Sequence, residues 1–230
     1  MTKPMPLSFS RLSTFEQCEA KFDYLYVSKR VQDQQNEASA YGDRVHQILE
    51  ARGKGELDEF NLTEEGRATL AKWGPLVDRI SCREGEKFYE YQMAVNADLK
   101  PVDWFAADVW IRSIADVLVV NGDTAYCLDY KTGKVKDNPT QLQLFAAMAM
   151  WHFPQVNKVK TSYIWLAYDQ ITNATYERRF LEALWNALKP RFVRVQETID
   201  MGVFKSKPSP LCGWCAAKDI CPDAKLKGRR

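Results

Sequence analysis

The stretch Ile114–Lys131, IADVLVVNGDTAYCLDYK, decides the fold. Two runs rich in β-branched and aromatic residues flank Asn121-Gly122-Asp123. An Asn-Gly pair between two such runs is a strong short-range signal for a β-hairpin. We therefore expect two neighbouring antiparallel strands at the centre of the fold.

The register of this hairpin decides whether its two aspartates share a face. A two-residue turn at Asn121-Gly122 puts Asp116 opposite Cys127, with Asp129 two residues along on the same face. A turn at Gly122-Asp123 puts Asp116 directly opposite Asp129. A three-residue loop would put the aspartates on opposite faces. Either two-residue turn therefore predicts a pair of carboxylates on one side of the sheet.

Lys131 should point to the same side as Asp129, because side chains alternate along a strand. Two carboxylates can hold a divalent cation such as Mg²⁺, which polarises a phosphoryl oxygen and lowers the pKa of a bound water. A lysine beside them can position that water and offset the charge that builds on the phosphate. These groups suit phosphodiester hydrolysis, whereas an ordinary ion pair at strand ends is the structural alternative.

The composition sets the class of protein. The chain has 230 residues, 46% hydrophobic and 12% aromatic, which is typical of a folded globular protein. A formal charge of +2 gives no global attraction for a polyanion, so nucleic-acid binding would need a local groove. No run reaches the roughly 18 apolar residues of a membrane span, and no signal peptide is apparent. We expect a soluble, cytoplasmic protein that does not contact membranes.

Periodicity and capping signals predict the remaining elements and favour an α/β fold with a mixed central sheet flanked by helices. We expect a single domain over residues 1–230, with a helical excursion at about residues 53–85 and a Cys-rich C-terminal segment at 208–224. The expected helices cover residues 11–27 with Ser10 as N-cap, 38–52, 63–80, 139–151 and 181–201, and the other expected strands cover 88–97, 106–111, 161–169 and 176–180.

Two helices carry side chains that could join the hairpin. His46 and Glu50 are four residues apart and therefore share a helix face, although a hydrogen-bonded histidine beside a surface glutamate is the simpler interpretation. Gln141 lies in the first turn of the helix that follows Asn138-Pro139 and can point back to the open end of the hairpin. The pattern leaves open whether Glu90 faces this site or solvent.

Cysteines gather near the C-terminus. Cys212-Gly213-Trp214-Cys215 is a C-x-x-C pair, and Cys221 follows closely. Such a pair is typical of a zinc clip, a redox pair or iron–sulfur ligation, and disulfides are uncommon inside cells. Cys18, inside the expected helix 11–27, is the candidate fourth ligand. Cys82 and Cys127 stand alone, and we expect them to be buried thiols.

Several motifs, in this order, resemble the RecB-like branch of the PD-(D/E)XK nuclease superfamily. They are Gly42-x-x-x-His46, Ile114-Ala115-Asp116, Asp129-Tyr130-Lys131-Thr132-Gly133 and Gln141-Leu142-Gln143-Leu144-Phe145. With Cys18 near the start and three cysteines near the end, the chain is most similar to iron–sulfur exonucleases related to the CRISPR-associated RecB-like nuclease and the AddB nuclease domain. The resemblance implies a restriction-endonuclease-like core.

The resemblance also implies roles for individual residues. His46, Asp116 and Asp129 would be ligands of Mg²⁺ or Mn²⁺, Lys131 the catalytic lysine and Gln141 the motif glutamine beside the site. A [4Fe–4S] cluster, with Zn²⁺ as the alternative, would join the N- and C-terminal helical segments through four cysteines, namely Cys18, Cys212, Cys215 and Cys221.

Two positions depart from the pattern of this branch. Asp129 stands where many relatives have glutamate, which keeps the ligand chemistry. Phe145 stands where tyrosine is usual, which removes a hydroxyl that could contact DNA.

By this resemblance we expect a metal-dependent deoxyribonuclease, an exonuclease acting on single-stranded DNA or duplex ends. Partners would be DNA and proteins of recombination, replication or CRISPR adaptation. A structure-selective or nicking endonuclease on the same core is one alternative. A non-catalytic, zinc-stapled DNA-binding or recombination adaptor is the other.

Overall fold

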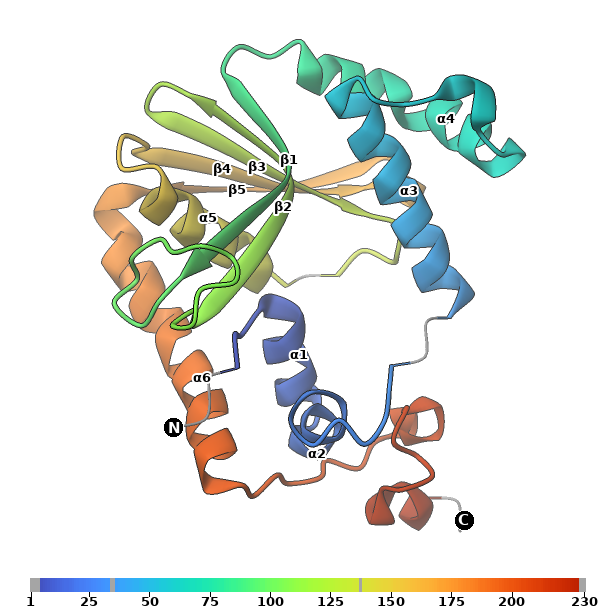
Figure 1. The fold of residues 1–230 in the computed structure, drawn as a ribbon, viewed down its shortest axis with the longest axis vertical. Coiled ribbons are helices and arrows are strands. Elements are labelled where there is room, and N and C mark those ends of the chain that lie inside the picture. Colours follow the sequence, from blue (N-terminus) through green and yellow to red (C-terminus); the bar gives the residue numbers. More distant parts are fainter. Residues whose placement is uncertain (1–4, 34–35, 137, 228–230) are drawn as a thin grey trace. The chain divides into compact units, whose positions relative to one another are not determined.

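The computed structural model describes residues 5–33, 36–136 and 138–227 (Figure 1). The chain divides into two compact units. Of the described residues, 5–6, 36–136 and 138–185 form the sheet unit, and 7–33 and 186–227 form the terminal unit. The division into compact units does not test whether the chain forms one domain, so the single domain over residues 1–230 stays a prediction.

The sheet unit is built on five strands in the order β1-β2-β3-β4-β5. Neighbouring strands are antiparallel except for β3 and β4, which are parallel and are joined through helix α5. The expected α/β fold with a mixed sheet flanked by helices is therefore confirmed. The strands are β1 Glu86–Val95, β2 Ile111–Asn121, β3 Thr124–Lys131, β4 Lys158–Trp165 and β5 Gln170–Glu177.

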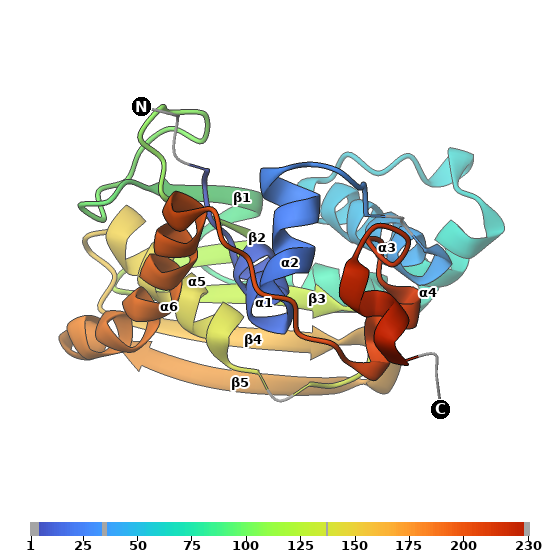
Figure 2. The same cartoon turned by 90° about the horizontal axis from the view of Figure 1, so that it is seen from below.

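Helices cover both faces of this sheet (Figures 1 and 2). On one face, α3 (Glu37–Lys54) and α4 (Glu64–Ser81) form an apolar core with alternate strand residues such as Val117 and Val119. On the other, α5 (Thr140–His152) contacts all five strands and is almost wholly buried. Short 3-10 segments occur at Glu59–Asn61, Leu166–Tyr168 and Arg178–Phe180.

The central hairpin forms in one of the two expected registers. Asn121 pairs with Thr124, so Gly122 and Asp123 make the turn. Gly122 has a φ of +56°, the left-handed backbone that a type II′ turn needs at its first central position and that glycine adopts without strain. Asp116 consequently lies directly across from Asp129.

The strand expected at residues 106–111 is wrong, because β2 begins only at Ile111 and a loop precedes it. Trp104 and Phe105 in that loop stack against the Arg112 guanidinium. The aromatic residues there pack within a loop and do not belong to a β-strand. Local composition cannot distinguish these two cases, because aromatic residues are common in both.

The terminal unit contains α1 (Phe9–Gln17), α2 (Glu19–Phe22), a π-helical turn (Asp23–Val27), α6 (Leu181–Met201) from Asn186 onward, and 3-10 segments at Pro210–Trp214 and Pro222–Lys227. The single helix expected at 11–27 is wrong in two respects. It starts earlier, because the Ser8 hydroxyl and not that of Ser10 accepts the capping bond from Arg11. It also breaks at Cys18, whose backbone is extended.

Polar contacts join the N- and C-terminal segments within the terminal unit. Arg191 makes two hydrogen bonds of 2.7 Å with Glu16, and Arg194 contacts Glu19 at 2.8 Å. The Lys205 backbone also donates to Glu19 at 3.0 Å. These contacts hold α6 and the segment that follows it beside α1 and α2. No helix among the described residues is long and apolar enough to cross a membrane.

Candidate functional site

Two strands separate at the point where the aspartates face each other. The β2–β3 ladder ends at the Val117–Leu128 pair, and beyond it β3 pairs Asp129 with Tyr163 on β4. We call this point, defined by Asp116 and Asp129, the fork. Here the Tyr130 backbone N–H donates to Asp116 Oδ2 at 2.5 Å. A main-chain donor therefore fixes the orientation of one of the two carboxylates.

His46 reaches the fork from α3. Its Nδ1 lies 3.4 Å from Asp116 Oδ1. Gly42 lies one turn earlier, where a Cβ would approach Thr132 Oγ1 to 3.0 Å, so the missing side chain lets α3 pass close to the end of β3. Burial alone would lower the pKa of His46, but the hydrogen bond and charge of Asp116 outweigh it and raise that pKa. The imidazole is thus paired with a carboxylate.

Asp129 is held by two side chains. Gln141, in the first turn of α5, donates from Nε2 to Asp129 Oδ1 at 2.8 Å, and the Lys131 ammonium forms an ion pair with Oδ2. Only 4% of the Asp129 side chain is exposed. Burial raises the pKa of Asp129 and the Asp116 carboxylate adds to this rise, while Lys131 opposes it. A nearby cation is therefore needed to keep this buried carboxylate ionised.

Glu90 on β1 is a site residue that the sequence left open. One ligand atom each from His46, Glu90 and Asp116 lie within 4.8 Å of one another. Burial and the charges of Asp116 and Glu50 raise the pKa of Glu90 to about 7. Among the described residues, Asp129 is not part of this group of potential metal-binding atoms, although it lies across from Asp116.

Tyr163 on β4 is a second residue that the sequence did not single out. Its ring centre lies 5.4 Å from the Lys131 ammonium, and its hydroxyl donates to the Asn138 carbonyl oxygen at 3.1 Å. The parallel pairing of β3 with β4 brings Tyr163 beside Asp129. No local pattern could have revealed this neighbour, because the strands are joined by a long crossover.

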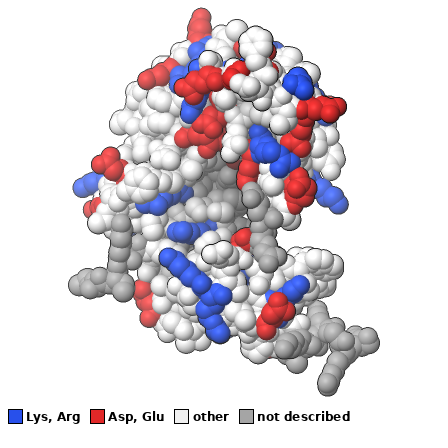
Figure 3. Space-filling view, turned by 45° about the vertical axis from the view of Figure 1, so that its right-hand side comes forward, with Lys and Arg blue, Asp and Glu red and all other residues white. Residues whose placement is uncertain are grey.

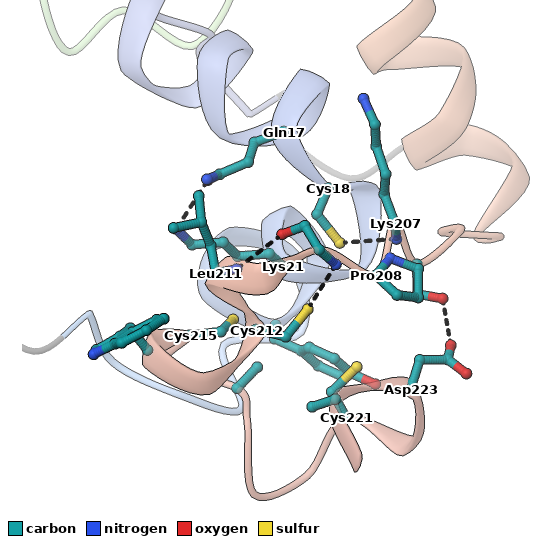
Figure 4. Close-up of a pocket in the computed structure, with 16 residues that line it drawn as sticks. Gln17, Cys18, Lys21, Lys207, Pro208, Leu211, Cys212, Cys215, Cys221 and Asp223 are labelled. Atoms are coloured by element: carbon teal, nitrogen blue, oxygen red, sulfur yellow. Dashed lines mark hydrogen bonds between the residues drawn. The ribbon is translucent and has the colours of Figure 1, made fainter. Parts of the chain in front are cut away.

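The four cysteines of interest line one pocket in the terminal unit, with a volume of about 240 Å³ (Figure 4). Cys18 comes from the break between α1 and α2, and the other three come from the tail. Two sulfurs already accept backbone hydrogen bonds, Cys18 from Lys207 at 3.4 Å and Cys212 from Ser209 at 3.2 Å. The cysteines that line the pocket form no disulfide, namely Cys18, Cys212, Cys215 and Cys221.

The remaining two cysteines differ from each other. Cys127 is fully buried, as expected, and burial raises the pKa of its thiol to about 12. The same expectation is wrong for Cys82, which is exposed at the C-terminal end of α4. Cys82 is exposed because it follows the last turn of α4.

Charge is mixed over the surface. On the face drawn in Figure 3, basic and acidic side chains are interspersed instead of forming a field of one sign. On α3 and α4, Arg44 pairs with Glu65 and Arg52 pairs with Asp78.

Comparisons with known proteins agree with the fold. The chain aligns with the solved structure of SSO0001 at 16% identity and a TM-score of 0.50, covering 97% of this chain and 89% of the other. It aligns with a candidate exonuclease from Eubacterium rectale at 13% identity and a TM-score of 0.55, covering 96% and 88%. At these identities the likeness concerns the fold alone. No curated protein matches.

A family model gives the assignment that structural likeness cannot. The model described as PD-(D/E)XK nuclease superfamily matches residues 6–222. This range includes the fork, His46, Gln141 and the cysteines of the pocket. The chain belongs to the PD-(D/E)XK nuclease superfamily.

Proposed function

We propose that this protein is a DNA exonuclease that depends on Mg²⁺ or Mn²⁺ and degrades single strands or duplex ends. The observation that carries the proposal is the fork, where Asp116 and Asp129 face each other with Lys131 at the end of the same strand. Imidazole and carboxylate donors lie within 4.8 Å of one another beside it, and this donor set fits a divalent cation.

His46, Asp116 and Asp129 would hold the cation in this proposal. When bound, it would polarise the scissile phosphate and make a water more acidic. The Lys131 ammonium would orient that water and offset the charge that builds on phosphate oxygens. Gln141 would keep the Asp129 carboxylate in place through its 2.8 Å hydrogen bond, and the Tyr130 N–H would do the same for Asp116.

The matching experiment uses single-stranded DNA in linear, end-labelled form and in circular form, with Mg²⁺, Mn²⁺ or EDTA. We expect shortening of the linear strand with either cation, no cutting of the circle, and no reaction in EDTA. Cutting of the circle would instead identify an endonuclease. Asp116→Asn should abolish the reaction, whereas Asp123→Asn, in the hairpin turn, should leave it unchanged.

We further propose that the four cysteines of the terminal unit hold a [4Fe–4S] cluster with a structural role. The pocket has a volume of about 240 Å³. A single Zn²⁺ binds four sulfurs at about 2.3 Å, which draws them close together. All four cysteines line this one pocket, which has room for a group larger than a single ion. Thiolate ligands suit iron–sulfur clusters and zinc alike, so the resemblance to iron–sulfur exonucleases is the argument for iron.

Protein purified without oxygen should carry iron and acid-labile sulfide and absorb broadly in the visible range. Cys212→Ala should lose both, whereas Cys82→Ala, which changes an exposed thiol outside the pocket, should keep both. Bound zinc in place of iron would contradict the proposal for the cluster while leaving the proposed nuclease activity untouched.

A further inference from the structure

Glu90 has a backbone that a regular strand does not contain. Its φ is +49°, in the left-handed region that L-residues other than asparagine and aspartate seldom adopt. The ladder pairs Tyr89 with Val117 and Tyr91 with Ala115 on either side, so Glu90 lies across from Asp116. β1 therefore departs from regular geometry at the position opposite the fork.

The departure changes which way the neighbouring side chains point. Phe88 and Tyr91 both pack against the Phe153 ring, with centroid distances of 5.8 and 5.7 Å. Residues three apart in a strictly alternating strand face opposite sides. The alternation is thus interrupted between them, and the Glu90 carboxylate reaches His46 and Asp116.

The charges around Glu90 require a positive partner. Glu90 and Asp116 are two carboxylates whose oxygens lie within 4.8 Å of each other. Glu50 on α3 is already paired with Lys54 at 2.6 Å, and Lys131 is paired with Asp129. Like charges this close repel unless a proton or a cation lies between them. His46 alone supplies at most one positive charge for two carboxylates.

We propose that Glu90 is a further ligand of the divalent cation, beside His46, Asp116 and Asp129. This rests on the proposed metal-dependent nuclease function and deepens it by adding a ligand from β1. An imidazole nitrogen among carboxylates suits Mn²⁺ better than Mg²⁺, which prefers oxygen ligands and keeps several waters. The site therefore binds Mn²⁺ more tightly than Mg²⁺.

Titration of the full chain with Mn²⁺, followed by the electron paramagnetic resonance signal of the free ion, tests this directly. Glu90→Gln keeps the shape of the side chain and removes the charge, and we expect Mn²⁺ to bind about tenfold more weakly or worse, because even indirect partners of metal ligands change affinity by that much. The matched control is Glu86→Gln, an exposed glutamate on the same strand, which should bind as the wild type does.

Equal Mn²⁺ affinity of Glu90→Gln and wild-type protein would overturn the proposal. Displacement of Mn²⁺ by an equal concentration of Mg²⁺ would overturn the metal preference. The melting temperature of Glu90→Gln in EDTA should equal or exceed that of the wild type, because a repelling charge is gone. If this variant does not fold, Glu90→Asn, which tolerates the left-handed backbone, takes its place in the same titration.

Measuring Mn²⁺ binding and DNA cleavage separately distinguishes a failure of the ligand assignment from a failure of the proposed nuclease function. Mn²⁺ binding that depends on Glu90, in a protein that never cleaves DNA, would contradict the nuclease proposal and support the ligand assignment. Metal-dependent cleavage, together with Mn²⁺ binding that ignores Glu90→Gln, would contradict the ligand assignment alone.

Discussion

The fork of the sheet unit and the cysteine pocket of the terminal unit differ in how the protein arranges their candidate ligands. At the fork, Asp116 is oriented by a backbone N–H and Asp129 by Gln141 and Lys131. In the terminal unit, ion pairs such as Arg191 with Glu16 hold the chain segments together, and the four cysteines line one pocket. We propose that the first arrangement carries out the chemistry and that the second links the N- and C-terminal segments.

Because of this difference, substitutions in the two regions should have different effects on activity and on stability. Changes at the fork should act first on activity, because they alter charges where the proposed cation and the phosphate would bind. Changes in the pocket should act first on stability, because the proposed cluster would link the N- and C-terminal segments of the terminal unit. Four substitutions, in order of decreasing expected effect, test this contrast.

The largest effect is expected for Lys131→Ala, which removes the cation beside Asp129. We expect the initial rate of DNA cleavage with Mn²⁺ to fall by about 10²- to 10⁴-fold, the usual contribution of a proton-transferring or water-positioning group. Lys158→Ala on the neighbouring strand β4, where the lysine is exposed, is the matched control and should keep the wild-type rate. Equal rates of Lys131→Ala and Lys158→Ala would show that the fork does not carry the reaction.

The next effect is expected for Cys212→Ala. We expect loss of bound iron and a fall in the free energy of unfolding of about 3 kcal/mol, which lowers the melting temperature of a chain of this size by about 6–12 °C. Calorimetry measures the melting temperature of Cys212→Ala, with Cys82→Ala as the control variant. An unchanged melting temperature would mean that the cysteine pocket does not stabilise the terminal unit.

A smaller effect on rate is expected for Gln141→Ala. The variant loses the 2.8 Å hydrogen bond to Asp129, and we expect cleavage to slow by about 10- to 100-fold, as for other groups that orient metal ligands. Gln143→Ala, two residues along α5, is the control for side-chain loss on the same helix. If both glutamine variants slow the reaction equally, the effect lies in the helix and not in the hydrogen bond.

The smallest effect is expected for Arg191→Ala, in the terminal unit. Its ion pair with Glu16 is about one-third exposed, with 33% and 39% of the two side chains accessible. Such pairs contribute about 0.2–1 kcal/mol, less at high salt. Urea denaturation at low and high salt measures this, with Arg179→Ala in a more exposed pair as control. The cleavage rate should not change in either variant.

Local signals in the sequence predict most of the helices and the central hairpin. Thr63 caps α4, and the Asn138 side-chain oxygen accepts a hydrogen bond from the Thr140 backbone N–H at the start of α5. Such contacts can be predicted because they depend on neighbours within a few residues. The turn at Gly122-Asp123 was one of two registers that the sequence allowed. Choosing between them needed the paired strands themselves, since both turns satisfy the same composition.

Other features depended on distant parts of the chain. Glu90 could not be placed because its direction follows from a left-handed backbone within β1 and from α3 crossing above it. Cys18 was expected inside a helix, but the helix breaks there and exposes the thiol to the tail, nearly 190 residues away in sequence. Phe145 is buried in the core, where a tyrosine hydroxyl would have required a polar partner.

The most direct test compares one variant from each region. Cleavage of single-stranded DNA by Lys131→Ala and by Cys212→Ala is measured with Mn²⁺ at a temperature where both proteins are folded. The rates are expressed per folded molecule. We predict that Cys212→Ala keeps nearly the wild-type rate while Lys131→Ala has lost it. A Cys212→Ala protein that is folded but inactive, beside an active Lys131→Ala protein, would contradict the assignment of chemistry to the fork and of stapling to the cysteines.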